Sequence, residues 1–160
     1  MKYSIDTSAI LDGWRRYYPP DILPDVWTGF DDLVKKGHLA ATEEVLVELE
    51  RRDDDVHRWA KKRRKMFVPI DDAIQIVVSS ILGAHEKLVD TRRNRSAADP
   101  FVIGLAQIQG CTVVTGERAT GSADRPNIPD VCTALGIRCI GLLDLFREEG
   151  WRFVRARQRV

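Results

Sequence analysis

Apolar and polar positions along the chain follow two different periods, which predict short strands separated by helices. Segments with the short, apolar and β-branched character of strands cover residues 2–6, 66–70, 111–115 and 137–140. The segment at 111–115 is the clearest of them, because Gly110 and Gly116 flank it.

Between these segments, apolar residues recur at helical spacing. Trp14, Trp27 and Trp59 share this spacing with other apolar residues, which indicates that they belong to the core. Helices are predicted over residues 8–17, 24–36, 42–50, 53–65, 71–88, 100–109, 129–135 and 142–149.

Strands that alternate with helices are typical of a mostly parallel sheet covered on both faces. The sequence therefore predicts an α/β fold, a three-layer α/β/α single domain over residues 1–150, followed by a basic tail at 151–160. A length of 160 residues with 44% hydrophobic residues suffices for one core. In such sheets the functional site lies outside the carboxyl ends of the strands.

Composition narrows the classes of function. Charged residues make up 31% of the chain but the formal net charge is +1, which argues against bulk electrostatic coating of nucleic acid. Three cysteines without a Cys-x-x-Cys pair indicate small buried side chains in a reducing cytoplasm. The apolar stretches are too short to cross a bilayer and no signal peptide is recognisable, so we expect a cytoplasmic protein without membrane contact.

Four acidic residues are expected on the inner side of the fold or at one edge of the sheet. Asp6 closes the first strand and Glu117 follows the strand that ends at Thr115. Asp99 is in helical phase with core positions of its helix, and Glu48 flanks an apolar stripe. Carboxylates at close range repel one another unless a cation compensates them, and a hard ion such as Mg²⁺ or Mn²⁺ prefers oxygen ligands. The pattern predicts a metal site.

Each acid also has a simpler interpretation. Asp6 could cap the helix that starts near Ser8, and Asp99 before Pro100 is a good N-cap in its own right. Glu48 could be a solvated helix residue, with Glu44 as the alternative ligand, and Glu117 could be a loop charge. Taken singly these signals are weak, and their order along the chain carries the metal-site prediction.

The four acidic segments together resemble the motifs of the PIN-domain family, over residues 2 to about 146. The first resembling segment is Tyr-Ser-Ile-Asp-Thr-Ser-Ala, which contains Asp6. The second is Val-Leu-Val-Glu-Leu, which contains Glu48, and the third is Ala-Asp-Pro-Phe-Val-Ile-Gly-Leu-Ala, which contains Asp99. The fourth is Val-Val-Thr-Gly-Glu, where Glu117 replaces the usual Asp of the family. Segments 127–132 and 142–146, with Gly150-Trp151, resemble an uncharacterised prokaryotic branch related to toxin nucleases.

This resemblance implies an endoribonuclease that hydrolyses phosphodiester bonds with a metal-activated water. Asp6, Glu48, Asp99 and Glu117 would be the catalytic metal ligands. The Asp-to-Glu departure leaves the fourth position open between Glu117 and Asp130. The hydroxyl of Thr115 could hold a phosphate oxygen or a metal-bound water, or Thr115 could be an ordinary strand residue.

Basic clusters are candidates for contacts to RNA phosphates. Arg92, Arg93 and Arg95 are the favoured ones, because their predicted loop leads directly into Asp99. The basic run at 58–65 is read as a solvated helix face. The tail, with Trp151 and Phe153, could either pack on the domain or bind a partner.

The resemblance also implies partners: an RNA substrate, a small antitoxin protein that silences the enzyme, and a second copy in a homodimer. The alternative function is a non-catalytic PIN-like module that binds RNA or protein through a degraded metal site, to which the Glu117 replacement gives some support. A nucleotide hydrolase is disfavoured, because the chain has no Gly-rich loop of the Walker type. His38, His57 and His85 lack the spacing of a zinc hydrolase site.

Overall fold

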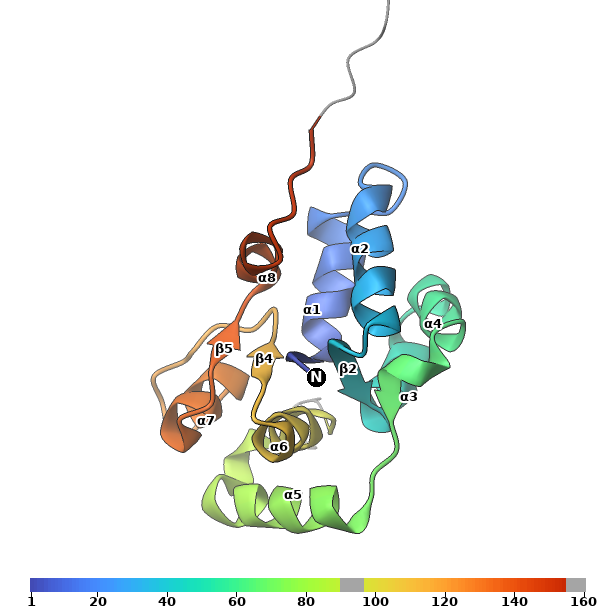
Figure 1. Cartoon of the computed structure of the whole chain (residues 1–160). Coiled ribbons are helices and arrows are strands. Elements are labelled where there is room, and N and C mark those ends of the chain that lie inside the picture. The colour runs from blue at the N-terminus through green and yellow to red at the C-terminus, as the bar shows by residue number, and fades with distance from the viewer. Residues whose placement is uncertain (90–96, 155–160) are drawn as a thin grey trace, which may run out of the picture.

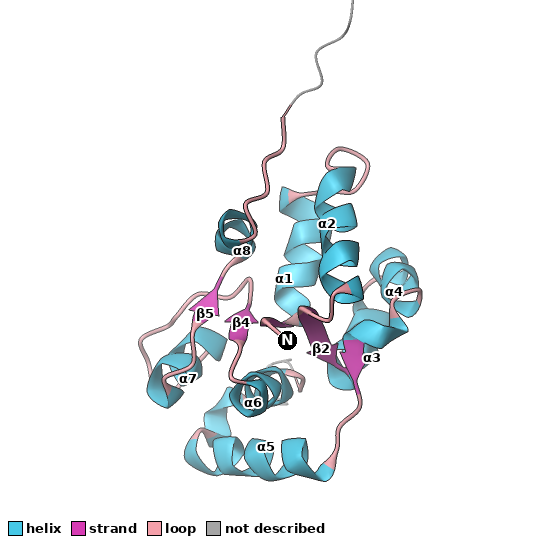
Figure 2. Cartoon of the chain, viewed as in Figure 1, coloured by secondary structure: helices cyan, strands magenta, loops and turns pink. Residues whose placement is uncertain are grey.

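A computed structural model of the chain describes residues 1–89 and 97–154 and contains a five-stranded parallel sheet between layers of helices (Figures 1 and 2). The strands are β1 (Tyr3–Ile5), β2 (Leu39–Thr42), β3 (Phe67–Val68), β4 (Thr112–Val114) and β5 (Cys139–Ile140). All pairings are parallel, in the order β3-β2-β1-β4-β5. The predicted three-layer α/β/α architecture is confirmed.

Helices connect every pair of consecutive strands. The α-helices are α1 (Thr7–Asp12), α2 (Pro24–Lys35), α3 (Glu43–Arg52), α4 (Asp54–Lys61), α5 (Asp72–Ala84), α6 (Asp99–Gln109), α7 (Ile128–Leu135) and α8 (Leu142–Glu148). A π-helical segment, η1 (Gly13–Tyr17), continues α1, and 3-10 turns occur at η2 (Arg64–Met66) and η3 (Glu86–Leu88). Figure 1 shows α1 and α2 on one side of the sheet and α5 and α6 on the other. Among the residues described, no helix has the length and apolarity that crossing a bilayer requires.

The order of the strands determines where a site can form. β1 lies in the centre, and the chain builds β2 and β3 on one side of it before it crosses to β4 and β5 on the other. Tyr3 of β1 is in register with Leu39 of β2 and with Thr112 of β4. The strand order therefore reverses between β1 and β4, and the carboxyl ends of these two strands are the place where ligands bind in open parallel sheets.

Strand β2 is absent from the elements that the sequence predicts. Its residues, Leu39-Ala40-Ala41-Thr42, contain two alanines, and alanine favours helices over strands. All four are buried, and the strand lies between β1 and β3 with helices packed on it. Burial from both sides of the sheet selects small side chains here and overrides the local preference.

Two predicted helices have different boundaries. The segment predicted as one helix at 53–65 is α4 followed by η2, because the Asp53 side chain accepts hydrogen bonds from the N–H groups of Asp55 (2.9 Å) and Val56 (3.0 Å) and starts α4 there. The first helix begins at Thr7 and changes to π-helical geometry at Gly13. Its N-cap is Asp6, the residue for which capping was the simpler interpretation.

Aromatic side chains form the core between the sheet and the helices on the α1 side. The Trp27 ring lies 4.7 Å from Trp14 and 5.1 Å from Trp59, both in edge-to-face geometry, as favoured by aromatic pairs. These three residues are core residues or pack against the core, as predicted.

The first residue of the predicted tail packs on the domain. The Trp151 ring stacks on Phe146 of α8 at 5.2 Å and meets Phe30 of α2 edge-on at 5.9 Å. A Cβ atom built on Gly29 would come within 2.6 Å of the Trp151 ring, so this contact requires a residue without a side chain at position 29. Residue 151 is thus part of the packed structure.

Candidate active site

The four acids predicted as metal ligands line one cavity of about 240 Å³. They come from four separate parts of the chain: Asp6 follows β1, Glu48 is in α3, Asp99 opens α6 and Glu117 follows β4. The cavity lies at the carboxyl edge of the sheet, where the strand order reverses. Its other lining residues are Thr7, Ser8, Leu11, Arg52, Leu88, Pro126 and Asn127.

Asp6 is held by one of its two carboxylate oxygens. Oδ2 accepts hydrogen bonds from the Ser8 N–H (3.1 Å), the Ser8 hydroxyl and the Thr115 hydroxyl (3.0 Å). Oδ1 is buried and has no hydrogen-bond partner within the described part of the chain. Because a buried carboxylate oxygen normally has a partner, Oδ1 has the environment of an atom that receives a ligand.

Burial changes the acidity of Asp6. Loss of solvent, with a further contribution from the negative charge of Glu117, raises the Asp6 pKa from its usual value of 3.8 to about 6. The hydrogen bonds from Ser8 and Thr115 act in the opposite direction. The net shift means that the ionised form is held at a cost, which a bound cation would remove.

A chain of hydroxyl groups joins β1 to the loop after β4. The Ser8 hydroxyl accepts a hydrogen bond from the Gly116 N–H (2.9 Å), and the Thr115 hydroxyl accepts one from the Glu117 N–H (3.1 Å). A Cβ atom on Gly116 would lie 3.0 Å from Asp12 Oδ2 and 3.2 Å from the Ser8 backbone, so the close approach favours glycine. The Glu117 side chain in turn accepts a hydrogen bond from the Ile128 N–H (2.9 Å).

Glu48 connects three elements around the cavity. It is 9% exposed, and its carboxylate accepts hydrogen bonds from the Thr7 hydroxyl at the start of α1 (2.7 Å) and from the Ala98 N–H before α6 (3.1 Å). Glu44, the alternative ligand, does not line the cavity. Glu48 is therefore the acid of α3 at this site, and Thr7 is a contact that sequence reasoning missed.

Asp99 lies in the first turn of α6 and does not cap it. The N-cap is Ala98, which has no side chain able to cap, and Asp99 is the first helical residue. The Asp99 side chain is 4% exposed and lines the cavity. The simpler interpretation of Asp99 as the N-cap is wrong, because the helix starts one residue earlier than the sequence predicts.

Asp130 lies outside the cavity and has a structural role. Its carboxylate accepts hydrogen bonds from the N–H groups of Thr120 (2.9 Å), Gly121 (2.9 Å) and Asn127 (2.8 Å), and it forms the capping box of α7. The predicted role of Asp130 as a metal ligand is therefore not supported by its position, and Glu117 is the fourth acid at the cavity.

Thr115 is buried at 3% exposure, and its hydroxyl is used within the protein, towards Asp6 and Glu117. It therefore positions Asp6 and Glu117 within the site, and its contact to RNA stays a prediction. The other predicted RNA contacts, Arg92, Arg93 and Arg95, lie outside the described residues.

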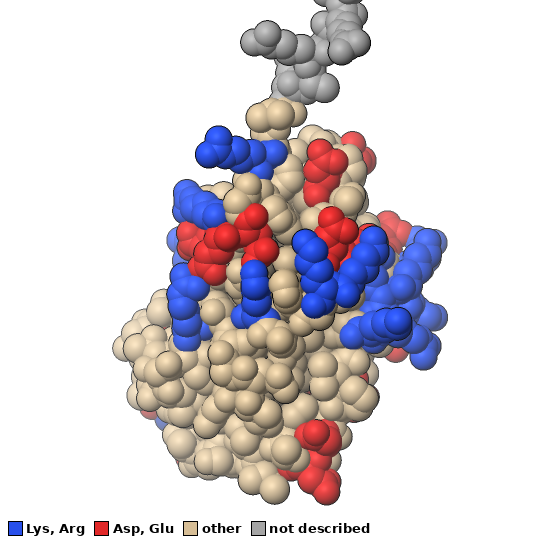
Figure 3. Space-filling view, viewed as in Figure 1, with Lys and Arg blue, Asp and Glu red and all other residues tan. Residues whose placement is uncertain are grey.

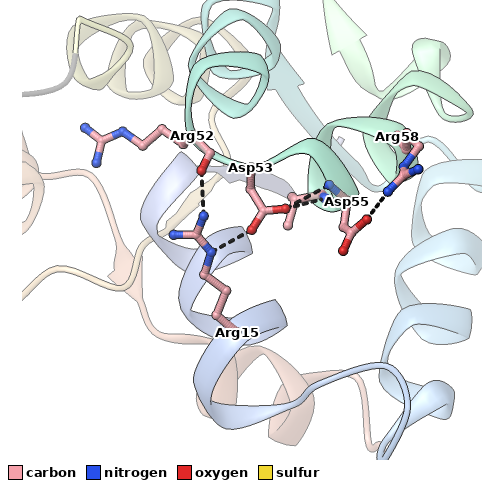
Figure 4. Close-up of polar contacts among 6 residues, drawn as sticks. Arg15, Arg52, Asp53, Asp55 and Arg58 are labelled. Carbon is pink, nitrogen blue, oxygen red and sulfur yellow. Dashed lines mark hydrogen bonds and ion pairs between the residues drawn. The ribbon is translucent and has the colours of Figure 1, made fainter.

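Arg52 is a basic residue of the cavity that the sequence did not single out. It ends α3, and the side chain of Arg15 holds the backbone there by donating to the Arg52 carbonyl (2.5 Å) and to Asp53 Oδ2 (2.7 Å). In Figure 4 the Arg52 side chain extends away from this contact. Only its positive charge could have pointed to it, and several neighbours have the same charge.

A separate groove, at the opposite edge of the sheet, is lined mainly by basic residues. Figure 3 shows Lys and Arg side chains gathered on the α4 side of the molecule, and the groove is lined by Asp31, Val34, Lys35, Lys62, Arg63, Arg64 and Lys65. Lys35 lies shortly before β2, and residues 62–65 lie shortly before β3. The groove is therefore at the amino edge of the sheet, opposite the carboxylate cavity. Arg63 pairs with Asp31 and lies 4.6 Å over the Trp59 ring, which is a structural role.

Within residues 1–89 and 97–154, no group of three or more His, Cys, Asp or Glu side chains is close enough to form a complete metal-binding cluster as it stands. The cavity thus brings four acids to one place, and three of them, Asp6, Glu48 and Glu117, accept hydrogen bonds from protein donors. Asp6 Oδ1 is a buried carboxylate oxygen of this cavity that has no hydrogen-bond partner among the residues described.

Comparisons with known proteins place the chain in a family. No curated protein matches it. A similar solved structure is the "Crystal structure of PAE2754 from Pyrobaculum aerophilum", with 17% sequence identity over 85% of this chain and 97% of that chain, and a TM-score of 0.40. Residues 3–153 match the model of a family described as a domain of unknown function (DUF4411), and because this match spans nearly the whole sequence, the chain belongs to that family.

Proposed function

We propose that this protein is a metal-dependent endoribonuclease. The observation that supports this function best is the convergence of Asp6, Glu48, Asp99 and Glu117, from four separate elements, on one cavity at the carboxyl edge of the sheet. Packing alone does not explain this convergence, because burying carboxylates near one another costs free energy unless a cation compensates them.

The residues of the cavity fit a hard divalent cation. Asp6 presents a buried oxygen without a partner in the described part of the protein, and all the acidic donors are oxygen atoms, which Mg²⁺ and Mn²⁺ prefer over nitrogen or sulfur. Asp6 and Asp99 would hold the ion, with Glu117 as a further ligand. When bound, such an ion lowers the pKa of a water molecule and neutralises charge at a phosphate.

The protein supplies the remaining functions of the site. Ser8 and Thr115 orient Asp6 by binding one oxygen, so that the other points elsewhere. Thr7 and the Ala98 N–H fix Glu48 differently, because each donates to a different one of its two carboxylate oxygens. Arg52 gives the acidic cavity a cationic wall, where a guanidinium can pair with the phosphate of an RNA strand.

A non-catalytic binding module is the second candidate. One observation favours it: Glu48 and Glu117 accept hydrogen bonds from protein donors, and the described residues contain no complete metal-binding cluster. The antitoxin partner and the homodimer stay predictions from the resemblance.

Metal dependence separates the two candidates. The full-length protein is incubated with fluorescent single-stranded RNA in Mn²⁺, in Mg²⁺ or in excess EDTA, and the fragments are resolved on a gel. We expect fragments with a divalent ion and none with EDTA, because the carboxylates alone cannot activate water. Binding of RNA without cleavage in any of the three conditions would favour the non-catalytic module.

A second prediction concerns the basic wall of the cavity. Arg52→Gln should lower kcat/KM for RNA cleavage by roughly 10-fold to 100-fold, the usual worth of a hydrogen bond to a charged group. Arg51→Gln is the matched control. It removes the same charge from the neighbouring residue, whose side chain does not line the cavity. Equal losses in the two variants would show a long-range effect of charge and would remove Arg52 from the site.

A further inference from the structure

A second groove lies beside the carboxylate cavity, at the same edge of the sheet. It has a volume of about 440 Å³, and Glu117 lines both spaces. Thr115 and Gly141 line the groove where β4 and β5 end, so it continues the cavity from β1 and β4 towards β5. A linear molecule lying along the carboxyl ends of the strands would pass from one space into the other.

The groove presents apolar side chains that the fold itself does not use. Tyr17 is 62% exposed and Leu143 is 50% exposed, although both line the groove. The neighbouring Tyr18 is different, because it packs edge-on against Phe146 at 4.9 Å. Tyr17 therefore has an exposed ring next to an anchored one, at a ring distance of 6.3 Å.

The backbone that carries Tyr17 is also distinctive. Tyr17 ends the π-helical segment η1, and the N–H of Tyr18 donates to the carbonyl of Gly13 (2.8 Å), which fixes the end of this segment. Short π-helical segments are rare and occur frequently at functional sites. The geometry orders an exposed aromatic side chain at the rim of a groove.

The charges of the groove select what it can bind. Asp12 and Glu117 line it, with Arg118 as an exposed cation. Two carboxylates disfavour a phosphate inside the groove, but they can accept hydrogen bonds from the amino groups of a nucleobase. An aromatic ring offers stacking to any base, since every base has a π-face.

We propose that this groove binds a nucleobase of single-stranded RNA next to the phosphate in the carboxylate cavity, with the base stacked on Tyr17. The inference rests on the proposed nuclease function and adds a subsite for one base, formed around Tyr17. Double-stranded RNA keeps its bases stacked inside the helix and cannot supply one to the groove.

Binding of labelled single-stranded RNA decamers, measured by fluorescence anisotropy in EDTA, tests the proposal without cleavage. Tyr17→Ala should weaken binding roughly 5-fold to 150-fold, the range for one base–aromatic stack. Tyr17→Phe keeps the ring and should bind like the wild type. Ile22→Ala is the matched control, because Ile22 is also an exposed apolar residue (70%) but does not line the groove.

A series of decamers that each lack one base identifies the bound position. For one member of the series, the wild type and Tyr17→Ala should bind equally, because the base that the ring contacts is missing. Equal affinities of Tyr17→Ala and the wild type for the intact decamer, or the same loss for every abasic decamer, would overturn the proposal. Either of these binding results would leave the nuclease function standing, because metal-dependent cleavage is measured separately. If the wild type failed to cleave RNA with a divalent ion, the nuclease function itself would be contradicted.

Discussion

Asp6→Asn and Glu48→Gln are each expected to lower kcat/KM for RNA cleavage by roughly 100-fold or more. Loss of a partner that only orients a metal ligand typically costs 10-fold to 100-fold, and loss of a ligand lies at or above the upper end of that range. Asp6 carries a buried oxygen that no other described residue contacts through a hydrogen bond, and Glu48 fixes the starts of α1 and α6 around the cavity. The measurement is the initial rate of cleavage of a fluorescent RNA in Mn²⁺.

Glu50→Gln is the control for both variants. Glu50 lies in the same helix as Glu48 but is exposed and does not line the cavity, so its removal changes the net charge equally without touching the site. We expect this variant to cleave like the wild type. Wild-type activity in Asp6→Asn would exclude the carboxylate cavity as the catalytic centre, whatever the activity of Glu48→Gln.

Asp6→Asn is also expected to stabilise the metal-free protein at neutral pH. Burial, with the charge of Glu117, raises the Asp6 pKa from 3.8 to about 6 in the folded state. The folded protein therefore holds the proton more tightly than the unfolded chain, and its stability falls as the pH rises from about 4 to about 6. Above this range the loss is constant, at about 3 kcal/mol if nothing else changes.

An asparagine avoids this cost, because it has no charge to desolvate and keeps an oxygen for the Ser8 N–H. In EDTA at about pH 7.5, the variant should melt roughly 5–10 °C above the wild type. At about pH 3 and below the two should melt together, since Asp6 is then mostly neutral in both states. A variant that melts below the wild type at neutral pH, or a gap that persists in acid, would contradict the burial cost assigned to Asp6.

Added Mn²⁺ provides an independent check of the same residue. A ligand that binds only the folded state raises its melting temperature, so the ion should stabilise the wild type and have a smaller effect on Asp6→Asn. The stabilising effect of the substitution and its loss of activity have one physical cause. The Asp6 carboxylate is needed for activity, but without a cation it lowers the stability of the folded protein.

The acids of the cavity could be predicted because their positions relative to strands and helices are local properties. Asp6 ends a strand and Glu117 follows one, so the geometry of a parallel sheet brings them to the same edge. Glu48 and Asp99 were assigned to the inner face from helical phase, and both are buried. Periodicity gives the direction of a side chain, which suffices when the elements are correct.

Other features depend on contacts between distant segments, which a single sequence does not reveal. Asp130 matched the charge expected of a ligand, but the loop at 120–127 folds back on it and satisfies its oxygens. Strand β2 follows from its buried place between β1 and β3, against the preference of its alanines. The contact between Thr7 and Glu48 requires α1 and α3 to lie side by side, and the local sequence of neither helix predicts this.

The contact between Trp151 and α2 has a consequence for the evolution of this family. An indole ring docked at residue 151 and any side chain at residue 29 exclude each other, because the first atom of such a side chain would already overlap the ring. These two positions, 122 residues apart in the sequence, should therefore change together. Sequences with a larger residue at 29 should have lost the tryptophan at 151.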